Sequence, residues 1–121
     1  MTTINDELKK AISEIKPSLM ATASKDGHPN VSPKGSLRVH DDQHLIFADL
    51  RSPQTVKNLA ENPNVSAIGL NTTTMKGWRI WGKAVEIMTS GEIFDELSKE
   101  YAKKGKIKHV VKIFVEKGLV F

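Results

Sequence analysis

A group of hydroxyl and ammonium side chains in the first half of the chain has the chemistry of a phosphate-binding site. Ser32, Lys34 and Ser36 alternate along one segment, and Thr55 closely follows a Ser-Pro pair. A serine that caps free N–H groups and a proline at the first helical position together predict a helix start there. The amides of Gln54 and Thr55 would then lie at the positive end of the helix dipole, where phosphate binds readily. The same residues also suit a plain helix cap beside an ordinary strand bend.

The histidines do not have the spacing of a metal site. His40 and His44 are four residues apart, but the Asp-Asp pair between them predicts a hairpin turn and not a helix that would align them. We therefore expect no metal site, while an axial haem ligand stays open for one of the four histidines, His28, His40, His44 and His109. No nucleophile is paired with a base, so a hydrolytic triad is not expected and the catalytic residues are not predicted.

The length and composition indicate one globular domain spanning residues 1–121. A chain of this size buries roughly two thirds of the surface that its unfolded form exposes, and its 39% hydrophobic and 26% charged residues are ordinary for such a domain. No segment approaches the ~20 apolar residues of a membrane span, and the first residues are acidic where a secretion signal would be basic. We expect a cytoplasmic protein with no membrane partner. The absence of cysteine excludes disulfides and thiolate chemistry.

The basic charge points to an anionic ligand more than to nucleic acid. The formal net charge is +4, but the lysines are spread along the chain and are densest at 99–112. That region is expected to hold a helix C-terminus, where lysines favourably meet the negative end of the helix dipole. We therefore interpret these lysines as a solvated surface and expect no nucleic-acid partner.

The hydrophobic pattern predicts a small antiparallel barrel with flanking helices. Helical spacing and capping signals predict three helices, at 4–15 with Thr3 as the cap, at 52–62, and from 91 to Gly105. Apolar runs separated by turn residues predict six strands, at 19–23, 31–39, 45–48, 65–70, 77–87 and 107–115. We expect the first three strands to pair in order as a meander, and a bulge at Gly82 in the fifth strand.

In this order of elements the chain resembles the FMN (flavin mononucleotide)-binding split-barrel family, which includes pyridoxamine 5′-phosphate oxidase. The resemblance runs from about Ile4 to Val115. It rests on the segments LMATA at 19–23, GHPNVSPKGS at 27–36, LIFAD at 45–49, TVKNLAENP at 55–63 and GKA at 82–84. The family implies a six-stranded antiparallel split β-barrel with FMN at a homodimer interface. Relatives that use haem or deazaflavin coenzymes leave those cofactors open.

The resemblance also implies which residues contact the cofactor. The residues that fall where relatives hold the flavin phosphate are Ser32, Ser36, Gln54 and Thr55, with Lys34, Arg51 and Lys57 as possible helpers. The residues implied along the flavin ring and its polar edge are Pro33, Lys34, Gly35, Ala48, Asp49 and Leu50. Gln54 departs from the lysine or arginine of several relatives, which implies a lower FMN affinity. Trp81 lies on a strand that reaches the dimer interface in relatives, and either faces the partner's flavin or packs in the core.

Two functions follow from this reading. The first is an FMN-dependent oxidoreductase or electron-transfer protein that exchanges electrons or hydride with a small molecule or a protein partner. The second is a carrier or storage module that binds FMN or haem without chemistry of its own. Genuine pyridoxamine 5′-phosphate oxidase activity is not expected, because the basic C-terminal segment with which longer members bind their substrate has no counterpart in this sequence.

Overall fold

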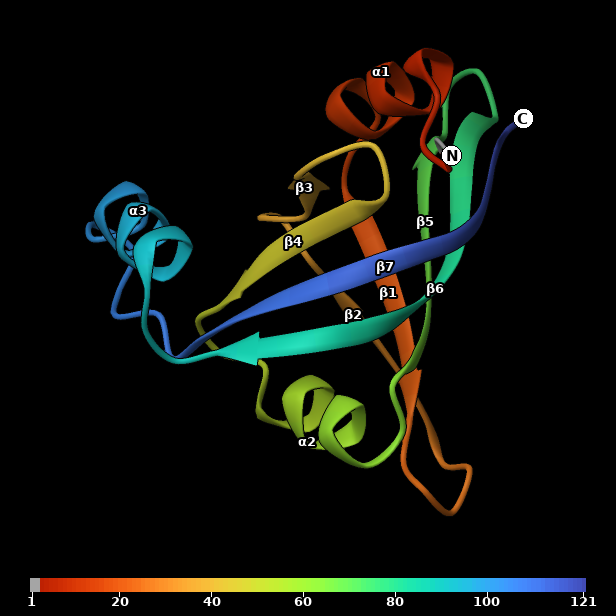
Figure 1. Cartoon of the computed structure of the whole chain (residues 1–121). Coiled ribbons are helices and arrows are strands. Elements are labelled where there is room, and N and C mark those ends of the chain that lie inside the picture. The colour runs from red at the N-terminus through yellow and green to blue at the C-terminus, as the bar shows by residue number, and fades with distance from the viewer. Residues whose placement is uncertain (1–2) are drawn as a thin grey trace.

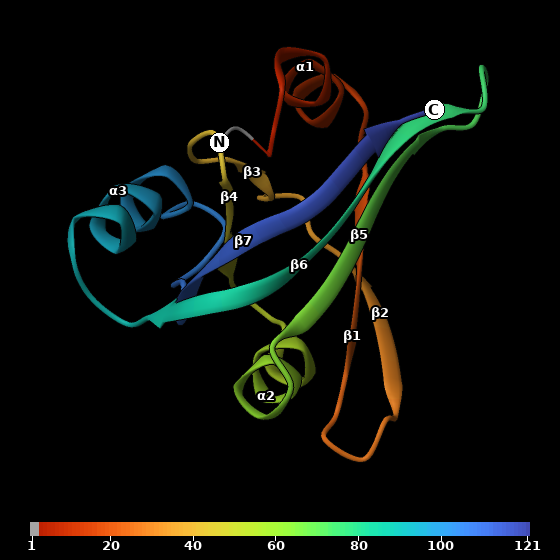
Figure 2. The same cartoon turned by 45° about the vertical axis from the view of Figure 1, so that its right-hand side comes forward.

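The computed structural model describes residues 3–121 and is built around one antiparallel sheet of seven strands. The strands are β1 (Ser18–Ala23), β2 (Pro29–Pro33), β3 (Arg38–Val39), β4 (His44–Asp49), β5 (Asn64–Asn71), β6 (Lys76–Met88) and β7 (His109–Val120). Their order across the sheet is β2-β1-β5-β6-β7-β4-β3, and the sheet twists strongly without closing into a full barrel (Figures 1 and 2). The predicted class, mainly β with flanking helices in a split-barrel arrangement, is confirmed.

The prediction of six strands was wrong, because the segment 31–39 is not one strand. β2 ends at Pro33, and the Lys34 N–H makes one more hydrogen bond to β1, at 2.8 Å to the Ser18 carbonyl. A turn follows, in which the Leu37 N–H donates to the Lys34 carbonyl at 3.2 Å, and β3 begins at Arg38. β2 and β3 then lie at opposite edges of the sheet. The predicted three-strand meander is therefore only partly right: β1 pairs with β2 and β3 with β4, but β1 also pairs with β5, and β4 with β7.

Two other boundaries differ from the prediction for identifiable reasons. Asn5, and not Thr3, caps the first helix, since the Asn5 side chain accepts a hydrogen bond from the Leu8 N–H at 2.9 Å. The last strand continues to Val120 because Gly118 lets it pass close to α1, where a Cβ would lie only 2.4 Å from Leu8 Cδ2.

The predicted bulge at Gly82 is confirmed. The pairing of β6 with β7 shifts register between Trp81 and Gly82. A Cβ at this position would lie 2.2 Å from the Phe114 carbonyl oxygen, so only glycine allows the two backbones to approach this closely.

Within residues 3–121, three helices cover the sheet and its ends: α1 (Asp6–Glu14), α2 (Pro53–Glu61) and α3 (Glu92–Glu100). None of the helices in the described part of the chain is long and apolar enough to span a membrane. α3 stops at Glu100, before the predicted end at Gly105, and residues 101–104 form a turn. Figures 1 and 2 show α1 and α3 near different ends of β4 and β7, with α2 below β6.

Strand β4 lies between two hydrophobic clusters, which fixes the position of its C-terminal end. Leu45 and Phe47 belong to the main core with α1, whereas Ile46 and Ala48 belong to a second cluster under α3. Successive side chains of a strand point to opposite faces, so burial on both sides immobilises the strand. Its last residue, Asp49, is 1% exposed and begins the connection to α2.

Candidate functional site

A buried lysine lies where β2 meets the start of α2. Lys34 is 3% exposed, and its Nζ donates to the Ser32 hydroxyl at 2.6 Å and to the Ser52 hydroxyl at 2.9 Å. The Ser32 and Thr55 hydroxyls are 3.1 Å apart. We call Ser32, Lys34, Ser52 and Thr55 the phosphate cluster. The structure thus brings together three of the four side chains with which the sequence analysis began.

The Lys34 ammonium has no carboxylate in contact with it. Among residues 3–121 it makes no ion pair within 4 Å. Burial lowers the pKa of Lys34, and the charge of Asp49 opposes this shift only in part. Its acceptors are neutral oxygens, those of the Ser32 and Ser52 hydroxyls and the Pro33 carbonyl at 3.5 Å, so this buried cation favours an anion as an additional partner.

Ser52 does not cap α2 as predicted. Its side chain makes no capping hydrogen bond, and its oxygen instead accepts a hydrogen bond from Lys34 Nζ. The first N–H groups of α2, those of Gln54 and Thr55, are therefore left without a side-chain cap. Gln54 directs its own amide nitrogen to Asn58 Oδ1 at 2.8 Å, away from the phosphate cluster.

The side chains of Ser36 and Asp49 make hydrogen bonds that connect the segments around the site. The Ser36 hydroxyl donates to the Ala48 carbonyl at 3.1 Å and accepts from the Ala48 N–H at 2.8 Å, so it does not point toward Lys34. Asp49 accepts from the Ser52 N–H at 2.7 Å, and its other oxygen lies 2.9 Å from His109 Nδ1. These bonds tie the end of β4 to the start of α2 and the start of β7.

A cavity of about 290 Å³ lies against these segments. It is lined by Pro33, Lys34, Gly35, Ser36, Ala48, Leu50, Arg51, Ser52, Tyr101 and Lys104. Seven of these residues were predicted as cofactor contacts. Ser32, Gln54 and Thr55 are outside this lining, as is Asp49, which is buried. We call this space the site cavity.

Tyr101 and Lys104 were not predicted as site residues. The helical spacing placed Tyr101 on the apolar face of α3, and it does pack there, yet its ring edge also reaches the site cavity. The Tyr101 hydroxyl accepts from Arg38 Nη2 at 2.7 Å, and Arg38 also binds Glu100 through both guanidinium nitrogens. Burial raises the pKa of Tyr101, so its phenol stays protonated at neutral pH.

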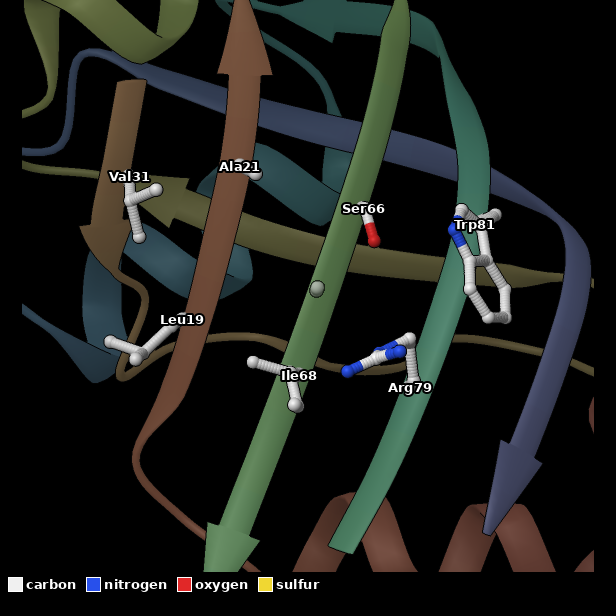
Figure 3. Close-up of a pocket in the computed structure, with 8 residues that line it drawn as sticks. Leu19, Ala21, Val31, Ser66, Ile68, Arg79 and Trp81 are labelled. Carbon is white, nitrogen blue, oxygen red and sulfur yellow. The ribbon is translucent and has the colours of Figure 1, made fainter. Parts of the chain in front are cut away.

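Trp81 is not part of the site cavity within one chain. It lies on the outer face of the sheet, beside a separate hollow of about 330 Å³ that we call the outer hollow (Figure 3). The outer hollow is lined by Leu19, Ala21, Val31, Ser66, Ala67, Ile68, Arg79 and Trp81. Figure 3 shows Arg79 reaching from β6 toward Ile68 on β5. The Arg79 guanidinium and the Lys117 ammonium lie 5.8 and 5.2 Å from the Trp81 ring centre.

The histidines of the described chain do not assemble a metal centre. No group of three potential ligands comes together in residues 3–121. His44 lies 2.8 Å from Asp41 at a hairpin turn, and His109 is held by Asp49.

The antiparallel split sheet, with a cation and hydroxyls at the start of α2, defines the class of the protein. The chain belongs to the pyridoxamine 5′-phosphate oxidase family, whose family model matches residues 4–117. The uncharacterized protein MJ0282 of Methanocaldococcus jannaschii is 33% identical over 117 residues, which cover 91% of this chain and 76% of that protein.

Solved structures show the same fold. HupZ of Group A Streptococcus is 29% identical with a TM-score of 0.86, covering 98% of this chain and 94% of that one. An FMN-binding protein of Syntrophomonas wolfei is 20% identical with a TM-score of 0.84, covering 93% and 82%. HutZ of Vibrio cholerae, a heme storage protein, is 18% identical with a TM-score of 0.71, covering 98% and 93%. The family fold therefore occurs in proteins that bind different cofactors.

The residues present fit the phosphate group of FMN. Lys34 offers a buried positive charge, the hydroxyls of the phosphate cluster offer donors, and α2 offers uncapped N–H groups. Gly35, which lines the site cavity beside them, faces open space, since an added Cβ would meet nothing within 4 Å.

Proposed function

We propose that this chain is an FMN-binding flavoprotein that works as a flavin-dependent oxidoreductase or electron-transfer protein. The observation that carries the proposal is the Lys34 ammonium, which is 3% exposed and donates to neutral oxygens of Ser32, Ser52 and Pro33 beside the site cavity. Membership of the family and the likeness to an FMN-binding protein support FMN as the ligand.

In this proposal each wall of the site has a separate task. Lys34, Ser32 and Thr55 bind the phosphate, while the strand from Pro33 to Gly35 and the end of β4 orient the ring system. The protonated Tyr101 keeps its part of the cavity wall uncharged. FMN supplies hydride and one-electron chemistry when bound, and the protein sets its position and electrostatic surroundings.

We further propose that the active form is a homodimer in which Trp81 faces the partner's flavin. The outer face of the sheet supports this, because Val31 is 63% and Leu19 is 41% exposed beside the outer hollow. Large apolar side chains gathered on one surface are typical of protein interfaces. The dimer would place Trp81 beside a cavity that it does not reach in its own chain.

The first test is the visible absorption spectrum of the purified protein, followed by acid release and mass identification of any coloured ligand. The proposal expects flavin bands and released FMN, or tight uptake of added FMN by a colourless preparation. A Soret band would replace it with haem binding, and a released deazaflavin would change the cofactor. A colourless protein that refuses all three would contradict it.

Turnover separates an enzyme from a carrier. If the protein is an oxidoreductase, the absorbance of bound FMN near 450 nm should bleach when a nicotinamide or protein donor is added. It should return when an electron acceptor follows. No bleaching with nicotinamide or protein donors would leave a binding module.

A further inference from the structure

We propose that the lysine-rich connection formed by residues 101–108, the turn after α3 and the segment that leads to β7, binds the phosphate groups of a second ligand, a reduced nicotinamide dinucleotide, at the mouth of the site cavity. The inference rests on the proposed function, because it names the class of molecule that would reduce the bound flavin. We call these residues the lysine turn.

The basic charge of the protein is concentrated in and after this turn. Residues 101–115 contain five lysines and no aspartate or glutamate, so the formal charge of this segment is +5. The formal net charge of the whole chain is +4, so all other residues together carry −1. In the turn itself the lysines are Lys103, Lys104, Lys106 and Lys108, all exposed. None of them forms an ion pair within 4 Å in the part of the chain that is described. They therefore present uncompensated positive charge to a ligand.

The lysine turn is anchored at the edge of the site cavity. Lys104 lines the cavity, and its ammonium lies 5.8 Å from the ring centre of Tyr101, another lining residue. The Lys108 N–H donates to the Asp49 carbonyl at 2.8 Å, and a Cβ on Gly105 would lie 3.7 Å from Leu50. Ile107 is 2% exposed and holds the turn in the cluster under α3. The backbone that carries these lysines is thus anchored beside the same wall that the flavin ring would use.

This placement favours a small polyanion over a macromolecule. A ligand that touches Lys104 and Tyr101 must enter the cavity with one part, while the exposed lysines outside it meet its remaining charge. A dinucleotide has this shape, with a flat reactive ring at one end and a pyrophosphate some distance away. The exposed lysines offer long-range attraction and not a buried cradle, so the binding should weaken steeply with salt.

The test is calorimetric titration of the full chain with ADP-ribose, which carries the pyrophosphate but no nicotinamide ring. We expect measurable binding to the wild type and at least tenfold weaker binding to K104E/K106E. The matched control is K25E/K76E, which makes the same change in charge in the β1–β2 turn and at the start of β6, away from α3 (Figure 1). We expect the control to change the affinity less than twofold and the wild-type affinity to fall between 50 and 300 mM salt. Circular dichroism would verify that both variants fold.

Two results would overturn the inference: no binding of ADP-ribose by the wild type, or equal weakening in both double variants, which would show a general charge effect. An FMN titration of the same samples separates this inference from the proposed function. FMN binding without ADP-ribose binding would reject the lysine turn alone. ADP-ribose binding that needs Lys104 and Lys106, in a protein that refuses FMN, would reject the flavin and keep the turn.

Discussion

Lys34 combines deep burial with a positive charge, and this combination decides what the site can bind. Burying an ammonium costs free energy unless a partner offsets it, and the two serine hydroxyls that hold Lys34 are neutral. An anion that enters the site would offset this cost. The lysine is therefore expected to weaken the ligand-free protein and to strengthen the complex.

Replacing Lys34 by methionine tests whether this side chain weakens the ligand-free protein and strengthens the complex. We expect K34M to be as stable as the wild type or more stable toward urea, because a buried charge is removed, while its FMN affinity falls at least tenfold, about 1.4 kcal/mol or more. The exposed Lys76, replaced by methionine, is the control for both measurements. A variant that lost stability but kept its FMN affinity would assign Lys34 a structural role.

The lowered pKa of Lys34 predicts a pH dependence of binding. In the ligand-free protein burial favours the neutral amine, whereas a bound phosphate would favour the ammonium, so binding takes up a proton above the lowered pKa. FMN affinity is then level below that pKa and falls by up to tenfold per pH unit above it. Fluorescence titrations from pH 7 to 10 would show this fall in the wild type, and its disappearance in K34M would assign it to Lys34.

The same pKa shift bears on the stability of the ligand-free protein. Because the folded pKa lies below the unfolded value, the unfolded chain holds the proton more tightly. The cost of the buried charge is present at neutral pH and is relieved as the pH rises through the folded pKa toward the unfolded one.

Gln54 allows a test with opposite charges at one exposed position. Thr55 is 1% exposed and would not accept a carboxylate, but its neighbour Gln54 is exposed in the first turn of α2. Both variants lose the hydrogen bond from Gln54 to Asn58, so they are compared with each other: Q54E should bind FMN several-fold more weakly than Q54K through repulsion of the phosphate, and the helix dipole should make Q54E the more stable by a few tenths of a kcal/mol. Urea and FMN titrations of both variants measure the two effects. Equal FMN affinities would mean that the phosphate binds elsewhere.

At the scale of elements, Asp49 joins three segments that are distant in sequence. Its two oxygens meet the Ser52 N–H at the start of α2 and His109 at the start of β7. We expect Asp49→Ala to lower the free energy of unfolding by about 1–3 kcal/mol, since it removes both hydrogen bonds of a buried carboxylate and leaves its half-buried partners unpaired. Asp26→Ala, in an exposed turn, should change it by less than 0.5 kcal/mol in the same urea experiment. A small loss in D49A would mean that the site is held by packing alone.

The elements that local signals specify were predicted well, and those that depend on distant contacts were not. The bulge at Gly82 follows from the residue itself, and the helices follow from apolar spacing and proline stops. The break between β2 and β3 was missed because the apolar pattern continues through it to Leu37 and Val39. The burial of Lys34 was equally invisible, since its hydroxyl partner Ser52 comes from another element and suited a cap.

At the scale of the whole molecule, the site depends on the packing of α3 against the sheet. Tyr101 and Lys104 reach the site cavity only because the cluster under α3 brings the helix end beside β4, more than 50 residues earlier in the chain. The lysines of this region were predicted to be a solvated surface, which their exposure bears out. Nothing in their spacing indicated that the surface adjoins a cavity, so this part of the site was beyond sequence reasoning.

The proposed dimer is best tested on the outer face of the sheet. Val31 and Val85 have similar exposure, 63% and 55%, but only Val31 lines the outer hollow. Placing a carboxylate in an apolar interface is costly because the charge loses water without gaining a partner. Val31→Glu should therefore shift the protein to the monomer in light scattering after size exclusion, whereas Val85→Glu should leave the dimer intact.

FMN binding then shows whether the dimer completes the site. If the partner's Trp81 covers the flavin, V31E should lose flavin affinity together with dimerisation, and the quenching of flavin fluorescence should fall in Trp81→Leu, which keeps the apolar surface. A wild type that is monomeric at micromolar concentration and still binds FMN would refute the shared site. A V31E monomer with unchanged FMN affinity would do the same, since a cofactor held between two chains cannot be indifferent to their separation.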